Sequence, residues 1–233
     1  MPRRLRWQIK VAELRRVFRS DQNQLVDAHI ARLCVLYEDL RIELKAVSAP
    51  SIPLLDVLDP SDAGTEPHSV GAYRRHYFLR RSVCTLFEFA EGLRLLGECS
   101  EFEPIMAGAD TPIVSLWDKS VEFFRSRERF IQDVRNDVGG HFGSKAAIYA
   151  VPNIDPKAIG KIELRYDDDQ RCEPRLHFVA SIAGVAFLKH LEGATVKEKT
   201  EGFIRNVLLA GYHHATNSVQ VLVVLHLWPR FGR

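Results

Sequence analysis

The chain has 233 residues, of which 46% are hydrophobic and 27% are charged, a composition typical of a globular protein with one elaborated domain. The formal net charge of +2 excludes a uniformly basic nucleic-acid-binding surface and restricts any contact with RNA to local basic faces. The four cysteines are far apart and form no C-x-x-C pair, so the sequence indicates neither a disulfide framework nor a structural metal site.

The N-terminal part of the chain is predicted to be helical. Apolar residues recur at three- and four-residue steps over residues 5–46, which indicates one long or two abutting amphipathic helices. The segment "SDQN", residues 20–23, is the expected break, because serine and aspartate are good N-caps. Residues 48–69 contain four prolines among serines and aspartates, which predicts a long irregular connection.

Two further helices are predicted in the middle of the chain. The first covers residues 70–96, and its first half has a basic side. That side consists of Arg74, Arg75, Arg80 and Arg81. The second has Thr111 as its expected N-cap and Pro112 at its first helical position, and its apolar period continues as far as Gly139 and Gly140.

The C-terminal part changes from one period to another. Apolar and polar residues alternate around an aspartate-rich turn, which predicts a β-hairpin with strands near 161–167 and 174–180. A capping box that starts at Thr195 then opens a helix that is expected to stop at Pro229. The sequence therefore predicts a mainly α single domain, a bundle of about four to five long helices with one small β-hairpin near 161–180.

The location of the protein follows from what the sequence lacks. Its basic N-terminal segment has no continuous apolar core of the kind found in secretory signals, and no later run approaches the length of a membrane span. We expect a cytoplasmic protein that contacts no membrane. No motif calls for a cofactor or a metal ion, and we predict none.

The segment "VRNDVGGHFG", residues 134–143, places an arginine, an amide and a histidine around two glycines. On a continuous helix Arg135 and His141 would differ by roughly 240° and would not share a face. Because glycine adopts the left-handed conformation that ends helices, Gly139 and Gly140 are expected to let His141 turn away from the helical path and approach Arg135.

The chemistry of this set is specific. Arginine offers a permanently charged fork suited to phosphate, and histidine gives or takes a proton near neutral pH. Together Arg135, Asn136 and His141 suit cleavage of a phosphodiester by the neighbouring 2'-hydroxyl, a reaction that needs proton transfer and stabilisation of a charged phosphorane but no metal ion. DNA lacks that hydroxyl and would not be cleaved.

The pair Arg135-Asn136, followed by four residues and His141, resembles the R-x(4-6)-H motif of the HEPN superfamily. The resemblance covers roughly residues 70–145 and implies a small helical bundle that acts as a metal-independent ribonuclease, with the motifs of two protomers facing each other across a homodimer interface. It implies phosphate binding by Arg135, orientation by Asn136 and acid–base catalysis by His141. Gly143 stands where HEPN toxins silenced by nucleotidylation carry a tyrosine, so regulation by that route is not supported.

Each of these features also has a purely structural interpretation. Arg135 and His141 suit the end of a helix, where a cation interacts favourably with the helix dipole and a histidine caps carbonyl groups. The four arginines of residues 74–81 suit either an RNA-backbone track or a solvated helix face. Two hypotheses about function follow. One is a HEPN-like endoribonuclease with RNA as substrate and an antitoxin or effector protein as partner; the other is a non-catalytic helical module that binds nucleic acid, a nucleotide or a protein.

Overall fold

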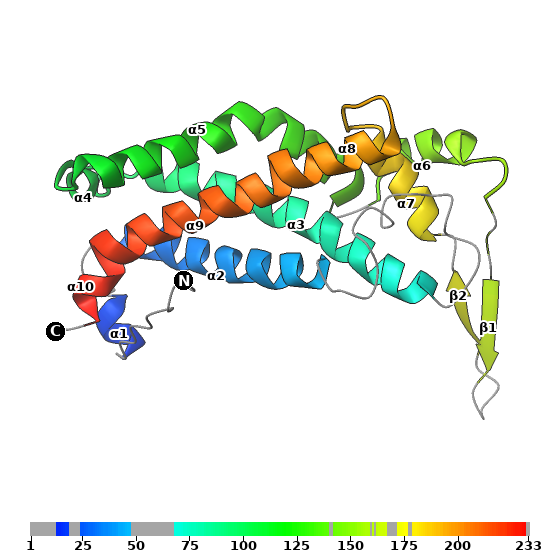
Figure 1. The fold of residues 1–233 in the computed structure, drawn as a ribbon. Helices are drawn as coiled ribbons and strands as arrows, with labels where there is room; N and C mark the ends of the chain where they lie inside the picture. Colours follow the sequence, from blue (N-terminus) through cyan, green and yellow to red (C-terminus); the bar gives the residue numbers. More distant parts are fainter. Residues whose placement is uncertain are drawn as a thin grey trace, which may run out of the picture.

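The computed structural model describes residues 13–18, 24–47, 68–139, 142–158, 160, 162–166, 172–176 and 179–231. Over these residues the protein is mainly helical, which confirms the mainly α part of the predicted fold class (Figure 1). The predicted break at residues 20–23 and nearly all of the predicted irregular connection lie outside the described residues.

The elements in chain order are α1 (Leu14–Val17), α2 (Gln24–Val47), α3 (His68–Gly97), α4 (Glu103–Ala107), α5 (Thr111–Val134), the π-helical turn η3 (Arg135–Gly139), α6 (Ser144–Ala150), the 3-10 turn η4 (Val151–Asn153), β1 (Ile162–Tyr166), β2 (Cys172–Leu176), α7 (Val179–Leu188), α8 (Val196–Phe203), the π-helical turn η5 (Ile204–Leu209), α9 (Ala210–Leu222), the π-helical turn η6 (Val223–Leu227) and α10 (Trp228–Arg230). The number of helices is higher than the four to five long ones predicted, because short helices such as α4, α6 and α7 join the long ones.

Four of the long helices form a bundle. Helix α2 packs against α3 and α9, and α5 packs against the same two helices. Figure 1 shows the four lying lengthwise beside one another. Their core contains fully or almost fully buried apolar side chains from every helix, including Leu33, Leu40, Leu86, Phe89, Phe124, Ile131, Ala215 and Leu222. Burial of each large side chain stabilises the fold by about 1.5–3 kcal/mol, so packing of these apolar faces holds the bundle together.

The boundaries of the two middle helices differ slightly from the prediction. Helix α3 begins at His68, so the last two residues of the predicted connection are helical. Helix α5 includes Thr111, and the N-cap is Asp110, which makes no side-chain capping bond. Pro112 therefore supplies the main local signal, because its ring fixes a backbone angle that suits the first turn and its missing N–H is not needed there.

The C-terminal helix begins with the predicted capping box. The backbone N–H of Glu198 donates to Thr195 Oγ1 over 3.1 Å, and the Glu198 carboxylate accepts from the Thr195 N–H over 3.3 Å. The helical path then continues through α8, η5, α9 and η6, and α10 ends at Arg230, one residue after the expected stop at Pro229. Two π-helical turns interrupt it, each of which locally widens the helix.

Two short segments in the second half of the chain pair as antiparallel strands, with Ile162 opposite Leu176 and Tyr166 opposite Cys172. The predicted second strand, 174–180, is wrong at its end, because residues from Val179 onward form helix α7. The sequence "VASIAGVAFL" is apolar except for Ser181, and such a run does not distinguish a buried strand from a buried helix. In the structure this run is helical and packs against α3 and α6.

Candidate functional site

The predicted motif begins in a π-helical turn. Arg135 and Asn136 are the first residues of η3, which directly follows α5. Arg135 Cζ lies 4.9 Å from the ring centre of Phe87 on α3, and Arg135 Nη1 donates to Asn136 Oδ1 over 3.1 Å. The arginine is therefore directed toward α3 by a ring contact and by its own neighbour. Its side chain still exposes 41% of its surface, so the guanidinium remains accessible to a ligand.

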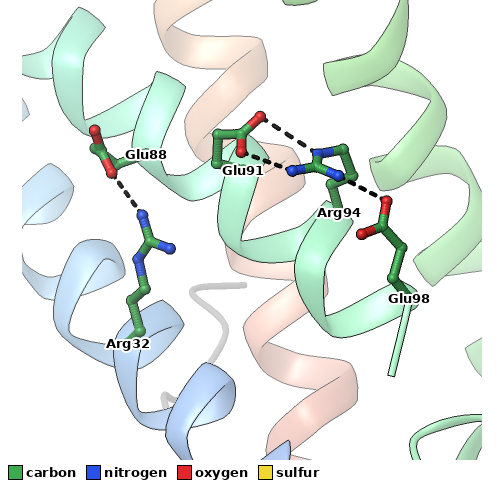
Figure 2. A network of polar contacts seen from close by, with 5 residues as sticks. All are labelled: Arg32, Glu88, Glu91, Arg94 and Glu98. Carbon is green, nitrogen blue, oxygen red and sulfur yellow. Dashed lines mark hydrogen bonds and ion pairs between the residues drawn. The ribbon is translucent and has the colours of Figure 1, made fainter. Parts of the chain in front are cut away.

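Glu88 of α3 lies between two arginines. Its Oε2 accepts a hydrogen bond of 2.5 Å from Arg32 Nη2 of α2, whereas its Oε1 lies 3.8 Å from Arg135 Nη2. Figure 2 shows Glu88 directed toward Arg32. Arg32 is thus the closer partner of this carboxylate. Arg135 has a carboxylate nearby that helps to position it without a short ion pair.

Another arginine on α3 is fully engaged. Arg94 binds Glu91 and Glu98 on its own helix, with its shortest contacts at 3.0 Å and 2.7 Å (Figure 2). These are neighbours three and four residues apart, the usual spacing of ion pairs on a helix surface. We interpret this group as a local stabilising network, in contrast to the partly engaged Arg135.

Arg135 and Asn136 line a pocket of about 420 Å³ between α2, α3 and η3. The other lining residues are Leu36, Asp39, Arg81, Cys84, Thr85 and Glu88. Arg81, predicted as a nucleic-acid contact, and Arg135, predicted as catalytic, therefore lie in one pocket although they are far apart in the chain. The pocket holds two arginine cations, the amide of Asn136 and the hydroxyl of Thr85. These are hydrogen-bond donors suited to a phosphate or another oxyanion, and they lie beside the carboxylates of Asp39 and Glu88.

The charges of three arginines act on the thiol of Cys84. Burial raises the pKa of Cys84, and the charges of Arg81, Arg135 and Arg80 oppose that rise, whereas Glu43 adds to it. Arg80 is half-buried, and its Nε has no hydrogen-bond partner among the described residues. The pKa of the buried His76, one turn earlier, is lowered to about 3 by burial and by Arg80. Three arginines are thus near one another at the junction of α3 and η3.

The remaining predicted residues are not placed in the pocket. Arg74 and Arg75 lie in the first turns of α3, and their side chains are outside the described part of the structure. His141 and Gly140 lie outside the described residues altogether. Convergence of His141 on Arg135 therefore stays a prediction.

Gly139 has a different role from the one expected. It lies in the last position of η3 and is buried, and among the described glycines the left-handed backbone occurs at Gly193. The expectation that Gly139 adopts that conformation was wrong. A Cβ atom at Gly139 would lie 2.7 Å from Cys84 Sγ, so a larger residue would force the Cys84 side chain or η3 to shift where η3 packs against α3.

The acidic residue of the motif points elsewhere. Asp137 Oδ2 lies 3.0 Å from His190 Nε2 and 3.5 Å from Lys189 Nζ, just after the end of α7. Asp137 therefore connects η3 to the turn that follows α7, whereas Arg135 lines the pocket. The two side chains of the motif therefore face different parts of the structure.

Glu43 of α2 was not among the predicted site residues, although it lies close to Arg81. Its side chain is only 8% exposed, its Oε1 accepts a hydrogen bond of 3.0 Å from Thr85 Oγ1, and the same oxygen lies 3.7 Å from Arg81 Nε. Burial raises the pKa of Glu43 to about 7, Asp39 adds to the rise, and the Thr85 hydrogen bond and the Arg81 charge oppose it. A signal was present, because Glu43 interrupts an apolar helical face three residues after Leu40.

No family model, curated protein or solved structure matches this chain. Within the described residues, no helix has the length and apolar character needed to cross a membrane. Over the same part of the chain, no group of three or more histidine, cysteine, aspartate or glutamate side chains is arranged to hold a metal ion. Any inference about function therefore rests on the geometry of the site.

Proposed function

We propose that this protein is a HEPN-like, metal-independent endoribonuclease of the cytoplasm, which binds the scissile phosphate of RNA in the pocket that contains Arg81, Arg135 and Asn136. The observation that carries the proposal is the convergence of Arg81 and Arg135, from two separate elements, on one open pocket. Two guanidinium groups that approach from different helices suit the several oxygens of one phosphate.

The long ion-pair distance of Arg135 supports binding of a ligand by its guanidinium group. Its nearest carboxylate contact, to Glu88, is 3.8 Å long, and Arg32 holds the other oxygen of that carboxylate. A phosphate oxygen at ordinary hydrogen-bond distance would be a closer partner than Glu88. Glu88 would then restrain Arg135 while the ligand takes its remaining donors.

The proposed reaction is attack of the ribose 2'-hydroxyl on the adjacent phosphorus, with release of the 5'-oxygen. The attacking hydroxyl must lose a proton and the leaving oxygen must gain one, and a histidine near its ordinary pKa can perform either transfer. We assign this role to His141. Arg135 would stabilise the negative charge that develops on the phosphorane, Arg81 would share that role, and Asn136 would orient Arg135.

The resemblance also implies a homodimer, in which a second copy of the chain would complete the site and carry a second His141. Light scattering on the purified protein tests this part of the proposal. A mass of one chain, 26.5 kDa, at concentrations where RNA is cleaved would contradict it.

A non-catalytic binding module is the second candidate function. Asp39 and Glu88 line the same pocket as the two arginines, so the local charge is close to balanced rather than strongly positive. Such a pocket suits a nucleotide or a mixed-charge protein segment as well as a polyanion. This module would keep the ligand-binding role of Arg135 and would not require proton transfer by His141.

The test is cleavage of a mixed RNA pool in EDTA by the wild type and by Arg135→Ala, Arg81→Ala and His141→Ala. Arg125→Ala is the matched control, because Arg125 is 74% exposed and pairs with Glu122 on its own helix. We expect the wild type and the control to leave 2',3'-cyclic phosphate and 5'-hydroxyl ends, and Arg135→Ala to lose about 100-fold or more in rate. Equal cleavage by all variants would refute the assignment. An inactive wild type that still binds RNA through Arg135 would favour the binding module.

A further inference from the structure

Glu43 is a buried carboxyl group with an incomplete set of partners. Thr85 donates to one oxygen, and Arg81 lies 3.7 Å from that same oxygen. The other oxygen, Oε2, is buried and has no hydrogen-bond partner among the described residues. Ionisation of this carboxyl group costs free energy, because burial removes water from Oε2 and no hydrogen-bond donor among the described residues replaces it.

The groups around Glu43 come from three elements. On α2 its charged neighbour is Asp39, which acts against ionisation of Glu43. On α3 it faces Arg81 and the hydroxyl of Thr85, and the Cys84 thiol lies within electrostatic range. From η3, the charge of Arg135 reaches Cys84 but is not among the causes that shift the Glu43 pKa. Arg81 is therefore the cation that responds directly to the charge of Glu43.

Arg81 has contacts on two sides. Its Nε approaches Glu43, and the residue also lines the pocket together with Arg135. Ionised Glu43 neutralises part of the positive charge of Arg81, whereas neutral Glu43 leaves that charge available to a ligand. The pKa of about 7 means that both forms are populated near neutral pH.

We propose that Glu43 is a positioning residue that controls the charge Arg81 presents to the pocket, and that an oxyanion entering the pocket binds together with a proton on Glu43. This inference deepens the proposed function and rests on it, because it assigns the same pocket to a phosphate group. It adds that RNA binding takes up a proton at a residue outside the predicted motif.

The direction of the pH effect follows from linkage. A bound anion places negative charge near Glu43 and engages Arg81, and both changes raise the proton affinity of the carboxyl. Anion affinity is therefore highest below neutral pH and falls as pH rises and Glu43 ionises. Glutamine at position 43 is neutral at every pH and keeps an oxygen that can accept from Thr85. Glu43→Gln should therefore bind the anion equally well across the range.

The experiment measures sulfate binding by calorimetry at constant ionic strength between about pH 6 and pH 8, where sulfate itself does not titrate. All proteins carry His141→Ala, so that this histidine contributes no pH dependence. We expect the parent to lose about fivefold in affinity over this range if the anion raises the Glu43 pKa by about one unit. We expect no loss with Glu43→Gln. Glu38→Gln is the control, because Glu38 is on the same helix with a side chain that is 54% exposed, and it should behave as the parent.

A flat profile in the parent, or the same slope in the parent and in Glu43→Gln, overturns the inference. A carbon-13 carboxyl titration of the wild type gives a second test that needs no variant at position 43: sulfate must raise the pKa of Glu43, and no change overturns the inference. Proton-linked sulfate binding without RNA cleavage would support this inference and refute the ribonuclease. RNA cleavage with pH-independent sulfate binding would support the ribonuclease and refute this inference. No sulfate binding at any pH would count against both.

Discussion

Helix α2 carries two buried acids, and their surroundings are opposite. Near its start, Asp27 accepts from Arg230 Nη1 over 2.8 Å and 3.0 Å with its two oxygens, and His226 Nε2 lies 2.5 Å from Oδ1. Arg230 also donates to the backbone oxygen of Val17 over 2.8 Å. Near the end of the same helix, Glu43 has one hydrogen bond and an oxygen without a partner in the part of the chain that the structure describes. The first cluster is satisfied, and the second is incomplete beside an open pocket.

The difference teaches how to separate a structural cluster from a ligand site. The Asp27 cluster joins α1, α2 and the C-terminal helix, and burial lowers the pKa of His226, although its hydrogen bond to Asp27 opposes that shift. His226 and the carboxylate share a hydrogen bond, and Arg230 supplies the positive charge that balances Asp27. The Glu43 cluster leaves polar capacity unused, which a ligand can fill. Asp27 and Glu43 are both buried on α2. Asp27 stabilises the fold at one end of the helix, and we propose that Glu43 takes part in ligand binding at the other.

The largest expected effect is at the satisfied cluster. Asp27→Ala leaves the buried His226 and the charge of Arg230 without their acceptor, and we expect it to lower the free energy of unfolding by about 3–5 kcal/mol. Chemical denaturation measures this. Glu38→Ala, on the exposed side of α2, is the control and should change stability by less than about 0.5 kcal/mol. Similar losses for the two variants would show that the Asp27 cluster is not a structural clamp.

The next effect concerns the contact that holds η3 beside the pocket. In Gly139→Ala the new methyl would lie 2.7 Å from Cys84 Sγ, and we expect a loss of about 1–3 kcal/mol. Gly202→Ala is the control, because no described residue lies within 4 Å of the atom added at Gly202 in α8, and helix propensity should stabilise that variant by roughly 0.5–1 kcal/mol.

The cause of the Gly139 effect is tested by a double variant. Combined with Cys84→Ala, which removes the sulfur, Gly139→Ala should cost less than it does alone, and a double-mutant cycle measures the coupling. Purely additive losses would contradict the steric explanation.

A smaller effect of opposite sign is expected at the incomplete cluster. Folding raises the pKa of Glu43 from 4.5 to about 7, so the folded protein holds a proton that the unfolded chain has lost between these values. This contribution to stability is full below the unfolded pKa and declines as pH rises through the folded pKa. We expect Glu43→Gln to stabilise the protein by about 1–2 kcal/mol near pH 8, after allowance for solvent at the pocket, and by little near pH 5. Destabilisation at both pH values would place Glu43 with Asp27 as a structural acid.

The smallest effect is expected at the surface network of Figure 2. Arg94 is 48% exposed, and exposed ion pairs contribute little because water and salt screen them. We expect Arg94→Ala to lower the free energy of unfolding by less than about 1 kcal/mol, and to lose part of that difference at high salt. A loss as large as that of Asp27→Ala would remove the distinction between the exposed and the buried groups.

Local signals in the sequence predicted the scaffold well. The three- and four-residue steps identified α2, α3 and α5, and the N-cap expected from Pro112, Thr111, lies one residue after the observed N-cap, Asp110. The capping box at Thr195 was confirmed as a pair of hydrogen bonds. Such features involve neighbours along the chain, so they are readable before the helices are packed. The apolar run from Val179 was ambiguous, because burial on all sides erases the period that separates strand from helix.

The candidate site was predictable only in part. Arg135 and Asn136 were selected by their order and by the helix that they follow, and Arg81 was selected separately as part of a basic face. Nothing along the chain relates Arg81 to Arg135, because their proximity results from the packing of α3 against α5 and η3. Glu43 was missed for the same reason, since its partners Thr85 and Arg81 lie on another helix.

The sequence by itself determined the helices, their caps and the residue types of the motif, because those depend on backbone geometry and on neighbours a few positions away. Tertiary structure alone decided that Gly139 is needed for close packing rather than for a left-handed turn, that Arg81 and Arg135 share a pocket, and that Glu43 is buried beside them. The physical reason is that these features depend on which helix faces pack together. Packing sets the distance from Gly139 to Cys84, the burial of the Glu43 carboxyl group and the proximity of the two arginines.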